Sequence, residues 1–308
     1  MDFEDRLTGP IKKIAVLVSL LAALILLVPT VAVPMIHLME THHQFLLVHG
    51  VNGQTRRVEI YWQKPSVVDG KNQKYPAIIY VHGMQKGHKP GGLGFVNAGI
   101  LSSDAKRGFF SVTLSLPGYG QSDGHPDFCG AESQASLSSA LSYVSKRPDI
   151  DPDHIGIVGI SCGATVAGMV ATRSHVSALV LISGFYDFRE MVQKWQTTDW
   201  PLPPAIKKEL EQNVVKDGGI ESASAVRSLM PHVLRLTMPI LLISGGHDHI
   251  VDVRQSERLH RLLDRQGTPN VFLLDGGAKH NIPVQYWRKK EERFLDARLL
   301  DLSPGQKY

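Results

Sequence analysis

The chain has 308 residues, of which 43% are hydrophobic and 20% are charged. These proportions are typical of a folded protein and exclude an intrinsically disordered chain, and the length fits one large domain with a short appendage. The formal net charge is +4, without a long basic run or basic residues interleaved with aromatic ones. We therefore expect no nucleic-acid partner.

Two cysteines, Cys129 and Cys162, are too few for a disulfide scaffold or a cysteine-rich zinc site. The sequence leaves open whether these two form a single bridge, because Cys162 also suits a small, buried position at the start of a helix. The 14 histidines include no HExxH or comparable ligand spacing. We therefore expect no catalytic metal.

An uncharged apolar segment, Ile14–Ile36, follows Lys12 and Lys13. A helix needs about 20 residues to cross the hydrocarbon of a bilayer, so the segment is long enough to form a single transmembrane helix. The positive-inside tendency then leaves residues 1–13 in the cytoplasm and the large domain on the non-cytoplasmic side, which is periplasmic, extracellular or lumenal. A signal peptide cleaved after Ala32 is the main alternative, and a buried core helix is another.

The folded domain is expected over residues 45–308. In chain order, the expected strands are Phe45–Val48, Arg57–Trp62, Ala77–Val81, Phe109–Leu116, His154–Ile160, Val176–Ile182, Ile240–Ile243 and Val271–Leu274. Asn52-Gly53 joins the first two as a hairpin. Helical periodicity occurs at Ala135–Val144, from Cys162 to Val170, at Val253–Leu263 and at Val284–Leu300. This alternation predicts an α/β fold with a mostly parallel sheet covered by helices on both faces.

Residues 187–232 break the alternation, because they are richer in Trp, Pro and charge and contain helical patches such as Ala205–Val214. We expect this segment to form a small helical cap inserted over the ends of the strands. An ordinary long crossover connection is the alternative.

The pentapeptide Gly159-Ile160-Ser161-Cys162-Gly163 matches the pattern G-x-S-x-G. The pattern alone is weak, but it lies between an expected strand and an expected helix, which is the context of a nucleophilic serine. Glycines have no Cβ to clash where strand and helix approach closely, so the Ser161 hydroxyl can project from the end of the sheet. The backbone N–H of Cys162 is then expected to point toward a developing oxyanion.

A nucleophilic serine needs a base that removes its proton and a carboxylate that orients this base. Asp248 and His280 each follow an expected strand, and the chain order Ser, Asp, His is that of α/β-hydrolases. Asp187, which also follows a strand, is the alternative carboxylate. For His280 the alternative is a surface loop histidine, whereas His82 is interpreted as a hydrogen-bonded residue that shapes a turn.

From about Phe45 to Leu300 the chain resembles the α/β-hydrolase superfamily, and within it the prolyl-oligopeptidase-like and dienelactone-hydrolase-like serine hydrolases. The residues that carry the resemblance are Tyr80-Val81-His82-Gly83, Leu116-Pro117-Gly118-Tyr119-Gly120-Gln121-Ser122, residues 151–156 leading to Ser161, Gly245-Gly246-His247-Asp248, and residues 276–280. The resemblance implies the α/β-hydrolase fold with an eight-stranded sheet, and a second oxyanion donor in the backbone N–H of Met84. The chain shows no HGGG run of lipases and no N-terminal β-propeller of true oligopeptidases, which disfavours peptide specificity.

The expected protein is a membrane-anchored serine hydrolase that cleaves small or medium carboxylic esters through Ser161, His280 and Asp248, without a cofactor. The Trp-containing cap is expected to shape an apolar acyl site. A serine peptidase or an acyltransferase is the first alternative, and a catalytically silent binding module at the membrane is the second. The oligomeric state has no signal in the sequence.

Overall fold

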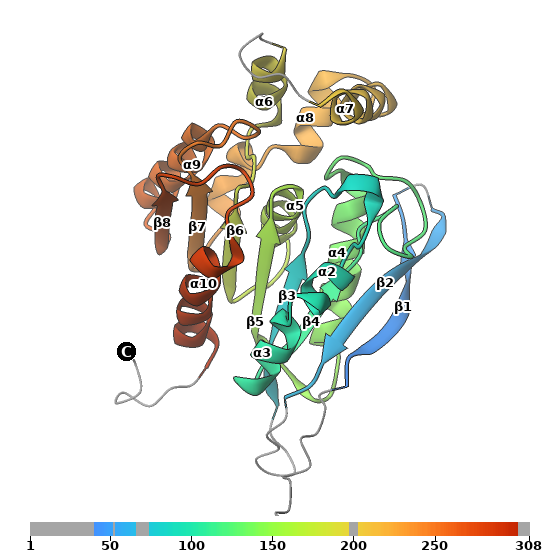
Figure 1. The fold of residues 1–308 in the computed structure, drawn as a ribbon, viewed down its shortest axis with the longest axis vertical. Helices are drawn as coiled ribbons and strands as arrows, with labels where there is room; N and C mark the ends of the chain where they lie inside the picture. Colours follow the sequence, from blue (N-terminus) through green and yellow to red (C-terminus); the bar gives the residue numbers. More distant parts are fainter. Residues whose placement is uncertain (1–39, 52, 66–73, 197–202, 301–308) are drawn as a thin grey trace, which may run out of the picture. The chain divides into compact units, whose positions relative to one another are not determined.

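A single eight-stranded sheet forms the centre of the structure, a computed structural model that describes residues 40–51, 53–65, 74–196 and 203–300 (Figure 1). The strands are β1 (His42–His49), β2 (Thr55–Gln63), β3 (Tyr75–Val81), β4 (Phe110–Leu114), β5 (Ile150–Ile160), β6 (Ala178–Ile182), β7 (Ile240–Gly245) and β8 (Asn270–Asp275). Their order across the sheet is β1-β2-β4-β3-β5-β6-β7-β8. β2 runs antiparallel to β1 and to β4, and the other neighbouring pairs of this sheet are parallel. The expectation of a mostly parallel eight-stranded sheet is confirmed.

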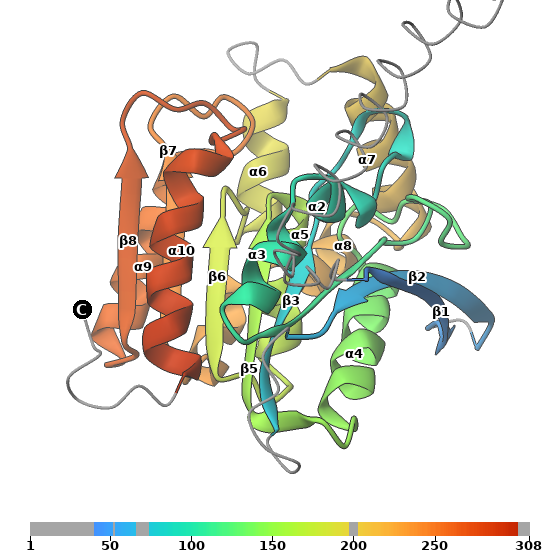
Figure 2. The same cartoon turned by 60° about the horizontal axis from the view of Figure 1, so that its bottom comes forward.

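Helices cover both faces of the sheet, as the two views in Figures 1 and 2 show. One face carries α4 (Ala131–Ser145), α5 (Cys162–Ala171) and α9 (Val253–Arg265), and the other carries α2 (Leu93–Asn97), α3 (Ile100–Lys106) and α10 (Val284–Leu299). Because neighbouring side chains of a strand point to opposite faces, Ile79 belongs to the core under α5 and Ile78 to the core under α10.

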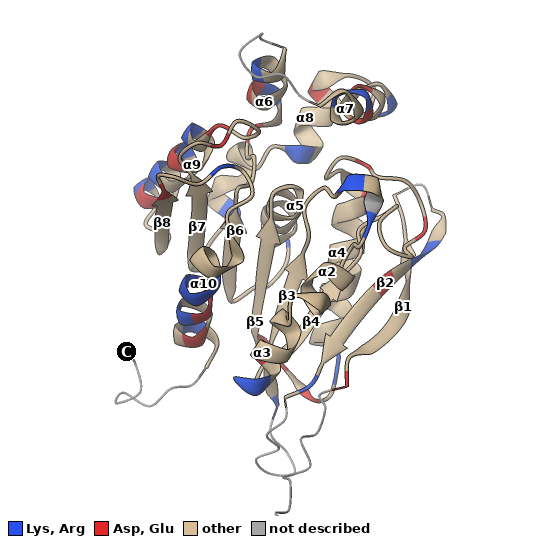
Figure 3. Cartoon of the chain, viewed as in Figure 1, with Lys and Arg blue, Asp and Glu red and all other residues tan. Residues whose placement is uncertain are grey.

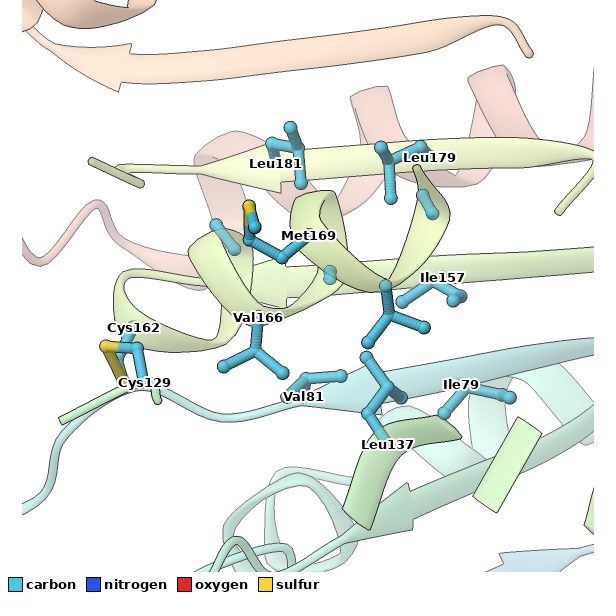
Figure 4. Packing of buried hydrophobic residues seen from close by; sticks show 14 of the residues in the cluster. Ile79, Val81, Cys129, Leu137, Ile157, Cys162, Val166, Met169, Leu179 and Leu181 are labelled. Atoms are coloured by element: carbon cyan, nitrogen blue, oxygen red, sulfur yellow. A yellow bond between two sulfur atoms is a disulfide. The ribbon is translucent and has the colours of Figure 1, made fainter. Parts of the chain in front are cut away.

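The core around α5 consists mainly of apolar side chains. Val166 and Met169 of this helix pack among Ile79, Ile157 and Leu181 of the strands (Figure 4). Helix α5 and strands β3 and β6 contain no Lys, Arg, Asp or Glu, whereas α7, α9 and α10 carry charges of both signs (Figure 3). The helix that follows Ser161 is therefore fixed by burial of apolar surface, the main driving force of folding.

Helices α2 and α3 lie between β3 and β4, where the sequence predicted no helix. Both are short, and this part of the chain contains Gly91, Gly92, Gly94 and Gly99, which lower intrinsic helix propensity. Their formation depends on tertiary packing, because Phe95 of α2 and Leu101 of α3 are buried in the core under α10.

Between β6 and β7 the chain forms α6 (Phe188–Trp195), α7 (Pro204–Lys216), α8 (Ile220–Arg227) and the 3-10 turn η2 (Met230–Arg235). Figure 1 shows α6 and α7 beyond the carboxyl ends of the parallel strands, in the segment for which we expected a cap. Within residues 40–51, 53–65, 74–196 and 203–300, no helix combines the length and hydrophobicity that crossing a bilayer requires. The expected cytoplasmic segment 1–13 and the expected span 14–36 lie outside the described residues.

A buried cluster of polar and charged side chains joins α10 to β3 and α3. Arg288 donates from Nη1 to the Tyr80 hydroxyl (2.7 Å) and to Glu291 Oε2 (2.6 Å), and it pairs with Asp104. Tyr80 donates to Glu291 Oε1 (2.9 Å), and Ser111 donates to Asp104 Oδ2 (2.8 Å). Burial raises the pKa of Glu291 to about 8. Arg288 also pairs through Nε with Glu292 Oε1 (3.0 Å), so Asp104 and Glu292 are its charged partners when Glu291 is neutral.

We expect Arg288→Met to lower the free energy of unfolding by about 3–5 kcal/mol, because it removes the nearest cation from buried Asp104 and leaves this carboxylate only the more distant Arg107 (3.4 Å). Urea denaturation followed by circular dichroism measures this loss. Arg293→Met is the matched control, because Arg293 is an exposed residue of the same helix. Equal unfolding midpoints for the two variants would contradict the assigned role of the cluster.

Candidate active site

Ser161 lies between the last residue of β5 and the first residue of α5, with φ 55° and ψ −120°. Such a backbone conformation is costly for a residue other than glycine and is typical of a nucleophile at a strand-to-helix turn. A Cβ at Gly159 would lie 2.3 Å from the carbonyl oxygen of Gly163, and a Cβ at Gly163 would lie 2.1 Å from that of Val81. Only glycine at both positions allows this turn.

The structure brings Ser161, His280 and Asp248 together at the carboxyl edge of the sheet. Ser161 Oγ lies 2.8 Å from His280 Nε2, and His280 Nδ1 lies 2.8 Å from Asp248 Oδ2. The other carboxylate oxygen of Asp248 accepts hydrogen bonds from the backbone N–H groups of Ile250 (2.8 Å) and Val251 (2.9 Å). Asp248 is buried, so its carboxylate needs a hydrogen-bond donor. A proton on His280 Nδ1 supplies this donor and leaves Nε2 free to accept the proton of the serine.

Asp187, the alternative carboxylate, has another role in the structure. It caps helix α6 by accepting a hydrogen bond from the N–H of Glu190 (3.0 Å), and its second oxygen pairs with Arg258 (2.6 Å). Asp248, by contrast, contacts the imidazole of His280. The geometry therefore favours Asp248 as the group that orients the base.

His82 is a buried residue that fixes the turn after β3. Its Nε2 accepts the N–H of Leu116 (3.0 Å), which leaves Nδ1 to donate to the carbonyl of Gly83 (2.7 Å). Burial lowers the pKa of His82 to about 4, so the ring is neutral near pH 7. These contacts agree with the interpretation of His82 as a residue that shapes a turn.

The two expected oxyanion donors, Met84 and Cys162, border the same cavity as Ser161 and His280. Cys162 is the first residue of α5, and an N–H group at this position has no acceptor within the helix. On the other side of the serine, a Cβ at Gly83 would lie 2.8 Å from Ser161 Cβ, so the backbone before Met84 passes directly beside Ser161. Both N–H groups thus belong to backbone adjacent to Ser161.

A disulfide joins Cys129 to Cys162, with 5.4 Å between the Cα atoms (Figure 4). This settles the pairing that the sequence left open. Phe128 and Cys129 both have positive φ values, 49° and 63°. Buried Arg227 of the cap donates from Nε to the carbonyl of Phe128 (2.7 Å) and from Nη2 to that of Asp127 (2.8 Å). The loop before α4 is thus attached both to the turn at Ser161 and, through Arg227, to α8 (Ile220–Arg227).

A cavity of about 480 Å³ surrounds the Ser161 hydroxyl. Its lining includes Phe95, Ile100, Phe128, Ile160, Ile182, Phe185, Trp195, Ile206, Ile250, Val251, Ile282, Val284 and Trp287. Among the described residues that line it, none is Lys, Arg, Asp or Glu. Its polar groups are therefore few, chiefly the serine, the two histidines, Gln85 and Asn281.

The lining comes from both hydrophobic cores. Phe128, Phe185 and Trp195 belong to the core under α5, whereas Phe95 and Trp287 belong to the core under α10. Apolar surface therefore flanks Ser161 from both faces of the sheet. Of these residues, only Trp195 lies in the Trp-containing segment 187–232 that was expected to shape an apolar site. The others come from separate elements that no local pattern connects.

In the described part of the chain, no three His, Cys, Asp or Glu side chains are grouped closely enough to hold a metal ion.

Residues 129–300 match the model of the prolyl oligopeptidase family. An uncharacterized protein of Mycobacterium tuberculosis is 30% identical over 176 residues, which cover 57% of this chain and 54% of that protein. The match thus spans about half the length of this relative.

Two solved structures share the fold. The esterase Pf2001 of Pyrococcus furiosus superposes with a TM-score of 0.61 at 14% identity, over 84% of this chain and 91% of that one. The acylaminoacyl peptidase of Pyrococcus horikoshii superposes with a TM-score of 0.66 at 17% identity, over 87% of this chain and 43% of that one.

We expect Cys129→Ser to lower the free energy of unfolding by about 3–4 kcal/mol, because the bridge closes a loop across a separation of 33 residues in the unfolded chain. Denaturant unfolding with and without a reducing agent measures the effect. The reducing agent should destabilise the wild type to a similar extent and leave a Cys129→Ser, Cys162→Ser double variant unchanged. Two free thiols in the unreduced, denatured wild type would contradict the bridge.

Proposed function

The chain belongs to the prolyl oligopeptidase family of serine hydrolases, and we propose that it cleaves carboxylic esters with Ser161 as the nucleophile. The observation that carries the proposal is the hydrogen-bonded series from Asp248 through His280 to the Ser161 hydroxyl, on the wall of an apolar cavity. A serine activated in this way attacks carbonyl carbon and forms an acyl-enzyme.

In the first half of the reaction, Ser161 Oγ bonds to the ester carbonyl carbon while His280 Nε2 takes the hydroxyl proton. The imidazolium then returns this proton to the departing alcohol, and the acyl group stays on Ser161. In the second half, His280 removes a proton from water, and the water oxygen attacks the acyl carbon. The bond from this carbon to Ser161 Oγ then breaks, the imidazolium returns the proton to Oγ, and the acid leaves. Asp248 stabilises the imidazolium in both halves, and the N–H groups of Met84 and Cys162 stabilise the oxyanion.

The absence of charged side chains from the described lining supports uncharged, apolar substrates. A peptide that is recognised by a free terminus brings an ammonium or a carboxylate, and burying either one without a partner of opposite charge is costly. An ester with apolar groups on one or both sides of the carbonyl has no such cost. The superposition also extends over 91% of the Pyrococcus furiosus esterase but only 43% of the acylaminoacyl peptidase.

We further propose that residues 14–36 anchor the chain in a membrane, with the hydrolase domain on the non-cytoplasmic side. The run of uncharged residues after Lys12 and Lys13 supports the anchor and its orientation. The Cys129–Cys162 bridge supports the location of the domain, because disulfides persist in oxidising compartments and are rare in the cytosol.

We expect Ser161→Ala to lower kcat for nitrophenyl esters on the order of 10⁶-fold, because it removes the nucleophile and leaves only binding and oxyanion stabilisation. The measurement uses the full-length chain, a series of acyl chain lengths, and labelling by a fluorophosphonate probe. Ser222→Ala, at an exposed position of α8, is the control. A folded wild type that neither hydrolyses the esters nor reacts with the probe would contradict the proposal, and a preference for amide substrates would favour a peptidase.

Deletion of residues 14–36 is expected to move the protein from the membrane pellet to the supernatant after cell lysis, because the bilayer-spanning segment is lost. The full-length Ser161→Ala variant should still sediment with the membranes, since it retains the anchor. Mass spectrometry of the purified full-length protein determines its N-terminus. A mature chain that begins just after Ala32 would instead indicate a cleaved signal peptide.

A further inference from the structure

Ser183 directly follows β6 and has φ 52°, although it is not a glycine. Its side chain is buried, with 2% exposure, and it does not belong to the lining of the cavity. Holding a residue with a Cβ in this conformation is energetically unfavourable. A glycine would adopt the same backbone conformation without strain. A serine at this position therefore requires a side-chain interaction that compensates for the strain.

The side-chain contact that the structure shows is a hydrogen bond from Ser183 Oγ to the backbone carbonyl of His280 (3.0 Å). The same carbonyl accepts the N–H of Ile282 (3.1 Å). A carbonyl has two lone pairs, so both bonds can form at once. Ser183 thus contacts the backbone of the residue whose imidazole faces Ser161.

The backbone on either side of this bond reaches the other two segments of the site. Ile182, one residue before Ser183, accepts the N–H of Ser161 (2.7 Å), and the N–H of Ser183 donates to the carbonyl of Ile243 in β7 (2.8 Å). β7 leads directly to Asp248. The end of β6 therefore lies between the strand that ends at the nucleophile and the strand that precedes the carboxylate.

The loop that carries His280 has separate attachments before that residue. The N–H of Gly246 donates to the carbonyl of Asp275 (2.7 Å), and the N–H of His247 donates to that of Ala278 (2.9 Å). These two bonds join the segment after β7 to residues that precede His280 in the chain. The Ser183 hydroxyl acts from the β6 side on His280 itself.

We propose that Ser183 is a positioning residue for His280: its hydroxyl holds the His280 backbone so that Nε2 stays within hydrogen-bond distance of the Ser161 hydroxyl. The proposal rests on the proposed roles of Ser161 and His280. Ser183 acts through His280 and does not line the cavity, so its loss affects the proton-transfer steps more than substrate binding.

The test compares Ser183→Ala and Ser183→Gly with the wild type, on nitrophenyl esters and with the fluorophosphonate probe. Alanine removes the hydroxyl and keeps the backbone strain, whereas glycine removes the hydroxyl and relieves the strain. We expect both variants to lower kcat about tenfold with little change in KM, because each loses one hydrogen bond. Probe labelling should slow by the same factor. Their unfolding midpoints should diverge, with the glycine variant the more stable.

Ser111→Ala is the control for loss of a buried serine, because its hydroxyl bonds Asp104 far from His280 in the sheet order. It should lower stability and leave kcat within twofold of the wild type. Folded Ser183 variants with unchanged kcat and labelling rates would overturn the proposal and leave Ser183 a structural residue. A wild type that is no more active than Ser161→Ala would instead overturn the proposed function, so the two failures are distinguishable.

Discussion

The close approach of α5 to the end of β3 is the constraint on which the site depends. The backbone at Gly163 lies so near the carbonyl of Val81 that no side chain fits between them. Helix α5 can therefore begin immediately after Ser161, with its free N–H groups beside the hydroxyl, while the chain leaving β3 passes the same serine at Gly83. A larger residue at position 163 would separate these two backbone segments, and both sources of N–H donors would lose their place.

The parallel sheet then supplies the remaining groups. Ser161 and His280 are 119 residues apart in sequence, yet their side chains lie 2.8 Å apart. The reason is that β5, β7 and β8 run in the same direction, so the segments after them meet at one edge. β6 lies between β5 and β7, and its last residues therefore contact the segments on both sides. Strand order explains why Ser183, which no motif marks, lies at the centre of this arrangement.

The sequence predicted those features that depend on local patterns. The strands appear as apolar runs, and Ser161, Asp248 and His280 each follow such a run, so their meeting at one edge could be foreseen from strand direction alone. The bridge from Cys129 was left open, and most aromatic side chains of the cavity and the Arg288 cluster could not be foreseen. Each joins elements that are distant in sequence and that come together only when the sheet has formed. Helices α2 and α3 were missed because glycines weaken their local signal and burial against α10 compensates.

The loop of Asp127, Phe128 and Cys129 supplies a fixed part of the cavity wall, because Phe128 lines the cavity. Asp127 accepts the N–H groups of Glu132 (2.8 Å) and Ser133 (2.9 Å) at the start of α4, so the loop is fixed to that helix. The two hydrogen bonds from Arg227 and the bridge to Cys162 fix it further, and these attachments offset the cost of two consecutive residues with positive φ. Phe128 consequently lies at a set position relative to Ser161. The side-chain volume of Phe128 therefore limits the space beside Ser161 in the cavity.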